Sequence, residues 1–151
     1  MKFRQTLIAA ASLFVLASTT ALAHSDEYLD TQKAPNGGQL RMAGVYHFEL
    51  VVAKDGKAGA SNPVVVYVTD HAGTKVSTAG AKGSAILLSG KSKATVALTP
   101  DGDNRLKGAG AYAATPDLKA IVSVTLAGKA AEQARFTPLA TVPDGHTDHK
   151  H

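Results

Sequence analysis

Glycine and proline interrupt this chain at short intervals, and this punctuation constrains the fold more than any other feature of the sequence. Fourteen glycines and six prolines separate short runs that are rich in valine, threonine and aromatic residues. Such spacing is typical of antiparallel sandwiches and barrels. It predicts an all-β fold, an immunoglobulin-like β-sandwich of about seven strands, with strands at residues 46–53, 63–69, 83–88, 92–98, 105–111, 120–126 and 131–136.

Alternation within these runs predicts which side chains form the core. In the run 46–53, Phe48 and Leu50 share one face of a strand, whereas His47 and Glu49 fall on the other. The expected core consists of Phe48, Leu50, Val52, Val64, Val66, Val68, Ile86, Leu88, Val96, Leu98, Ile121, Val124 and Phe136.

A hairpin turn is predicted at Asp70-His71-Ala72-Gly73. Gly73 can adopt a positive φ angle, and the Asp70 carboxylate can accept hydrogen bonds from the turn backbone. His71 is therefore expected to be a surface residue of the turn, unless the turn folds toward another histidine.

The first 23 residues have the parts of a secretory signal peptide. Lys2 and Arg4 are basic, an apolar stretch follows, and the small residues Ala21-Leu22-Ala23 form a cleavage site. Cleavage would leave a periplasmic protein that begins at His24 and has no membrane anchor. We expect a flexible arm over residues 24–34, one β-sandwich domain over 35–140 and a flexible histidine-rich tail over 141–151.

The histidine at the expected amino terminus favours metal binding. Such a residue can chelate Cu(II) through its α-amine and a ring nitrogen, and a third nitrogen can come from another imidazole, for which His47 is the candidate. The chain has no cysteine, so thiolate ligands and disulfides are both excluded.

The carboxy-terminal end carries three more histidines within six residues. Short links between imidazoles allow two or three of them to converge on one ion. The predicted metal ligands are therefore His24, His47, His146, His149 and His151. Copper is the expected ion, with nickel, cobalt and zinc as alternatives.

Residues 34–51 read Ala-Pro-Asn-Gly-Gly-Gln-Leu-Arg-Met-Ala-Gly-Val-Tyr-His-Phe-Glu-Leu-Val. The segment resembles small periplasmic proteins of proteobacteria that are associated with heavy-metal resistance. It is also similar to the opening module of some metal-efflux adaptor proteins, in which a Pro-His-Gly-Gly element precedes a Glu-Leu-Val strand. Gly37 and Gly38 match this motif, whereas Asn36 stands where the motif has histidine. A β-sandwich that begins with histidine is, in architecture, also similar to copper-binding proteins of the CopC type.

The resemblance implies a role in metal handling and a metal-efflux complex as a partner. The glycine pair also has a structural interpretation, a sharp turn that leads the backbone into the sheet. We predict a periplasmic transition-metal binding protein that buffers or delivers its ion. The alternative is a non-catalytic immunoglobulin-like interaction module that is an accessory to an envelope efflux complex.

Other classes of function have little support in the sequence. The lysines are scattered without interleaved aromatic residues, so no nucleic-acid binding is expected. No Gly-x-Ser-x-Gly element or other context for a nucleophile is present, and we do not expect an enzyme.

Overall fold

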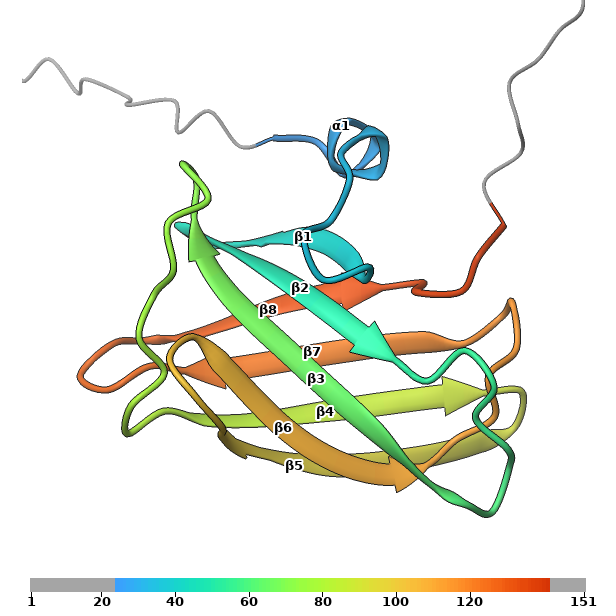
Figure 1. Ribbon diagram of the computed structural model, residues 1–151. Helices are drawn as coiled ribbons and strands as arrows, with labels where there is room; N and C mark the ends of the chain where they lie inside the picture. Colours follow the sequence, from blue (N-terminus) through green and yellow to red (C-terminus); the bar gives the residue numbers. More distant parts are fainter. Residues whose placement is uncertain (1–23, 142–151) are drawn as a thin grey trace, which may run out of the picture.

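Antiparallel strands make up most of the computed structural model, which describes residues 24–141 (Figure 1). One short helix precedes eight strands. The elements are α1 (Asp26–Thr31), β1 (Gln39–Ala43), β2 (Tyr46–Val52), β3 (Ser61–Asp70), β4 (Lys82–Ser89), β5 (Ser92–Pro100), β6 (Arg105–Ala111), β7 (Lys119–Thr125) and β8 (Ala131–Phe136). In residues 24–141 no helix is long and apolar enough to cross a membrane.

The strands follow the order β1-β2-β3-β6-β5-β4-β7-β8. Strands β4, β5 and β6 follow one another as antiparallel neighbours, β3 pairs with β6 and β7 pairs with β4, which makes two overlapping Greek keys. Strand β1 contacts β8, and the Thr137 amide donates a hydrogen bond of 2.8 Å to Gln39 Oε1. The sheet therefore curls almost into a barrel.

The predicted all-β fold is confirmed, with one strand more than the seven expected. The additional strand is β1, whose sequence Gln-Leu-Arg-Met-Ala places a charged residue among apolar ones. The side chain of Arg41 is nevertheless buried. The strand was missed because a charge at that position does not fit the apolar pattern on which the prediction depended.

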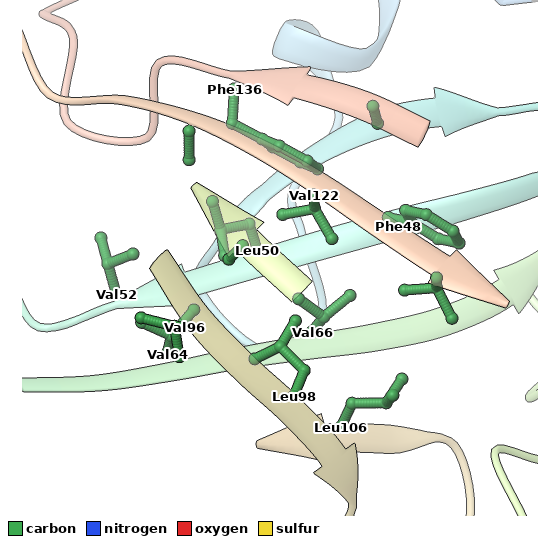
Figure 2. Packing of buried hydrophobic residues seen from close by; sticks show 14 of the residues in the cluster. Phe48, Leu50, Val52, Val64, Val66, Val96, Leu98, Leu106, Val122 and Phe136 are labelled. Carbon is green, nitrogen blue, oxygen red and sulfur yellow. The ribbon is translucent and has the colours of Figure 1, made fainter. Parts of the chain in front are cut away.

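The core lies between the two curved halves of the sheet, where Phe48, Leu50, Val66 and Phe136 meet side chains from β5 and β7 (Figure 2). Most of the predicted core residues are buried there. The prediction is wrong for Ile86, Leu88 and Ile121, which are only partly buried.

The error at these three positions has a simple cause. In β4 the inward residues are Ala85 and Leu87, and in β7 they include Val122. Because adjacent positions in these strands are all apolar, alternation alone does not determine which set faces the core. Ala85, Leu87 and Val122 take the inward positions, and Ile86, Leu88 and Ile121 face outward.

The outer face of β2 is buried as well. His47 and Glu49 point away from the core, yet their exposed fractions are only 8% and 3%. The covering segment is the chain before β1: the backbone amides of Asn36 and Gly38 donate to the Glu49 carboxylate, and the His24 ring lies beside His47. Residues 24–34, predicted as an arm, thus contain a helix that is too short to produce a readable apolar period.

Candidate metal centre

Three histidines from three separate parts of the chain meet at one end of the molecule. His24 precedes α1, His47 lies in β2, and His71 lies in the turn after β3. The ring centroids are 5.6 Å apart for His24 and His47, 6.0 Å for His24 and His71, and 5.0 Å for His47 and His71. In Figure 1 the start of α1 and the turn after β3 lie at the same end of the sheet.

The turn that presents His71 is held by its own backbone. Asp70 Oδ1 accepts hydrogen bonds from the amides of Ala72 and Thr74, at 2.9 and 2.8 Å. Gly73 has a φ angle of 80°, and its amide donates to the Asp70 carbonyl at 3.0 Å. The predicted turn is confirmed, and it folds toward His24 and His47. His71 therefore lies beside two other histidines, which is the exception that the sequence left open for this turn residue.

His24 is held beside the sheet by the segment that leads into α1. Ser25 is the N-cap of the helix, and its hydroxyl accepts a hydrogen bond of 3.2 Å from the Tyr28 amide. The Tyr28 ring packs on the His24 ring with centroids 4.9 Å apart. The cap and the aromatic contact keep the His24 imidazole close to the cluster.

Two ring nitrogens of this cluster are buried without a hydrogen-bond partner in the described part of the chain. They are His24 Nδ1 and His47 Nε2. A buried polar atom without a partner is costly and is uncommon in folded proteins. In the tautomer in which such a ring nitrogen carries no proton, its electron pair is available to a cation.

The surroundings of His47 favour its neutral form. Burial, followed by the neighbouring His71 and His24 rings, holds the pKa of the His47 imidazole below its usual value, although Asp70 opposes the shift. Only a neutral imidazole can donate an electron pair to a metal. The same environment that leaves His47 Nε2 without a partner therefore also keeps it able to act as a ligand.

The cluster is open and is not a closed coordination shell. Among residues 24–141, no group of three or more His, Asp or Glu side chains is arranged so that it could hold a metal ion. The His47 and His71 rings lie nearly parallel, with an interplanar angle of 13°, so their faces are turned toward each other. A shared ion requires at least one ring to rotate about its side-chain bonds.

Glu49 is committed to the loop before β1. Its Oε1 accepts hydrogen bonds from the amides of Asn36 and Gly38 at 2.8 and 3.0 Å, and its Oε2 accepts one from Asn36 Nδ2 at 2.8 Å. A Cβ atom on Gly38 would lie 2.3 Å from the Leu50 carbonyl oxygen. In this chain the glycine pair and the glutamate of the sequence motif therefore pack the loop onto β2.

A cavity of about 260 Å³ adjoins the cluster and is lined by His47, Tyr67, Thr69 and Lys75, among others. Another cavity, of about 600 Å³, lies between α1 and the ends of β7 and β8, and no histidine lines it. Although the second cavity is larger, the first is the one that His47 lines. Of these two cavities, the first is therefore the one beside a candidate metal ligand.

The predicted ligands divide into two groups. His24 and His47 lie together. His146, His149 and His151 lie outside the described residues. His71, which was not among the predicted ligands, joins the first group. The signal that could have identified it is its place in the hairpin turn, one residue after Asp70, but sequence does not show toward which segment a turn points.

Comparison of the chain with protein-family models, with curated proteins and with solved structures gives no significant match.

Proposed function

We propose that this protein binds a transition-metal ion, copper in particular, at His24, His47 and His71, and that it buffers or delivers the ion in the periplasm. The observation that carries the proposal is the convergence of three imidazoles, two of which have a buried nitrogen without a partner among residues 24–141.

The spacing of the rings suits a shared ion. Because metal–imidazole bonds are about 2.0 to 2.1 Å long, two rings bound to one ion have centroids roughly 4.5 to 6.5 Å apart. The three centroid distances of the cluster, from 5.0 to 6.0 Å, fall inside this interval. Rotation about the terminal bond of a histidine side chain meets only a broad, shallow barrier, so the rings can turn their nitrogens inward with little backbone movement.

Copper is favoured by the kind of donor that the cluster offers. Its donors are nitrogens, and divalent copper binds nitrogen ligands more tightly than the other divalent first-row metals do. If the chain is cleaved before His24, the freed α-amine adds a nitrogen beside His24 Nδ1. The two would close a chelate ring, and His47 and His71 would complete a tetragonal set suited to Cu(II).

The proposal leaves a separate role for the carboxy-terminal histidines. His146, His149 and His151 can capture an ion at low affinity, because histidines that are two or three residues apart can bind one ion without a folded site. The cluster at His24 would then hold the ion more tightly. Capture and retention would thus belong to different parts of the chain.

The proposal is tested by a Cu(II) titration of the protein that begins at His24. We expect one tight site, with nitrogen ligands visible in the electron paramagnetic resonance spectrum. Adding one alanine before His24 should weaken this site about tenfold or more, because it moves the amine away from the chelate. If the extended protein binds Cu(II) equally well, the amine is not a ligand. If neither protein has a tight site, the proposal fails.

Acid should weaken both the fold and the site. The pKa of His47 is lowered in the folded protein from its usual value of 6.5, so the unfolded chain takes up the proton first as the pH falls. The contribution of neutral His47 to stability is therefore complete above about pH 6.5 and is lost below it. Protonation of the imidazoles also competes with the ion.

We expect the melting temperature of the metal-free protein to fall as the pH is lowered from 7.5 to 5. The increase in melting temperature that Cu(II) causes should become smaller over the same range. The matched control is His47→Asn, which has no titrating ring at this position. Its metal-free melting temperature should depend less on pH over the same range. An identical pH dependence in the two proteins would contradict the assignment to His47.

A further inference from the structure

An ion pair connects β1, at the edge of the sheet, to α1. Arg41 Nη1 lies 2.7 Å from Asp30 Oδ1, and Arg41 Nη2 lies 3.3 Å from Asp30 Oδ2, so the carboxylate is held through both of its oxygens. Arg41 Nε also lies 3.6 Å from Asp26 Oδ1. Arg41, which is only 7% exposed, additionally donates a hydrogen bond of 2.8 Å from Nη1 to the Leu40 carbonyl.

This pair is one of the few attachments of a helix that is too short to be stable alone. Helix α1 has six residues, whereas isolated helices shorter than about 12 to 15 residues are marginal in water. Its only buried side chain is that of Leu29, which is 3% exposed. The position of α1 therefore depends on the contact of Leu29 and on the Arg41 ion pair.

His24 depends on α1 for its position in turn. It directly precedes the N-cap residue Ser25, and its ring packs on Tyr28 from the first turn of the helix. His47 and His71, in contrast, are fixed by the sheet and by the turn after β3. Release of α1 from β1 would thus remove one imidazole from the cluster and leave the other two in place.

We propose that Arg41 and Asp30 are positioning residues for the metal site, which hold His24 beside His47 and His71 through α1. This inference rests on the proposed function. The coupling is reciprocal, because an ion bound by His24 must stabilise the docked helix by as much as the docked helix strengthens binding of the ion.

The test is a double-mutant cycle in the full mature chain, with Cu(II) as the probe. Asp30→Ala should weaken Cu(II) binding about tenfold or more, as loss of a residue that orients a metal ligand commonly does. In a chain that already carries His24→Ala, the same Asp30→Ala change should alter the affinity by less than about twofold, because the imidazole that it positions is gone and the α-amine alone cannot close the chelate ring. An equal loss in both backgrounds would overturn the proposal.

Two control variants separate positioning from general effects of charge and stability. Glu27→Ala removes a carboxylate that belongs to the same helix and has no partner among the described residues. Asp101→Ala breaks the Arg105–Asp101 ion pair, which also has a distance of 2.7 Å but lies on the β5–β6 hairpin. Both should leave the affinity for Cu(II) within about twofold of the original. If Asp30→Ala behaves as these variants do, the proposal is wrong.

A measurement without metal keeps the inference separate from the proposed function. In the metal-free protein, nuclear Overhauser effects between the His24 and His47 rings should be present in the original chain and in Glu27→Ala, and lost in Asp30→Ala. If the original chain binds no copper, the proposed function fails while this result still decides whether Asp30 positions His24. Retention of the ring contacts in Asp30→Ala would overturn the inference even where copper binds.

Discussion

Replacing His24, His47 and His71 together by alanine should lower the affinity of the protein for Cu(II) by about a hundredfold or more, because three of the proposed nitrogen ligands are removed at once and each tenfold step corresponds to about 1.4 kcal/mol. Deleting residues 145–151, which contain the remaining histidines of the expected mature chain, should leave the tight site in place. Isothermal titration with Cu(II) distinguishes the two variants directly. The opposite pattern, with binding lost in the deletion and kept in the triple variant, would assign the affinity to the tail.

The triple variant should still fold, which makes it usable in cells as well. His71 is exposed and His24 is only partly buried. Replacing His47 removes a buried ring nitrogen that has no hydrogen-bond partner among the described residues. Cells that lack the protein should grow less well under copper, and the triple variant should fail to restore growth if metal binding is the function. Full restoration would favour the interaction module that the sequence also allowed.

The fold could be predicted from the sequence because its determinants are local. Alternation placed Phe48 and Leu50 on the core side of β2, and the Asp70 turn has the hydrogen bonds expected for its residues. Local patterns do not reveal what covers a face, however. His47 and Glu49 were expected on the outer face of β2 and do lie there, but the segment before β1 buries both.

The site could be anticipated only in part, because its members are distant in the sequence. His24 attracted interest through the expected cleavage site, and His47 through its strand face. Nothing near His71 indicates that the turn after β3 leans toward the start of α1. The position of the turn depends on the pairing of β2 with β3, because this pairing places His47 opposite Thr69, two residues before His71.

Replacing Phe48 by alanine should destabilise the fold by about 3 to 5 kcal/mol, because the ring is fully buried and its removal leaves a cavity that the neighbouring strands cannot close. Phe48 lies opposite Arg41 in β1 and Val68 in β3, so the cavity would open beneath β2, the strand that also carries His47. Urea unfolding measures the loss, with Val45→Ala as the control at a position that is 66% exposed, where a change of less than about 0.5 kcal/mol is expected.

The loss at Phe48 is a large fraction of what a domain of this size has available, since net stabilities are about 5 to 15 kcal/mol and the chain has no cysteine for a disulfide. Bound copper should restore part of it, because an ion that binds only the folded state stabilises that state in proportion to the logarithm of its concentration. We expect Cu(II) to restore part of the urea midpoint of Phe48→Ala, and to restore none of it when His24, His47 and His71 are also replaced. This pair of results would connect the core side of β2 to the site on its outer face. A loss below about 1 kcal/mol in Phe48→Ala would contradict the packing on which this connection depends.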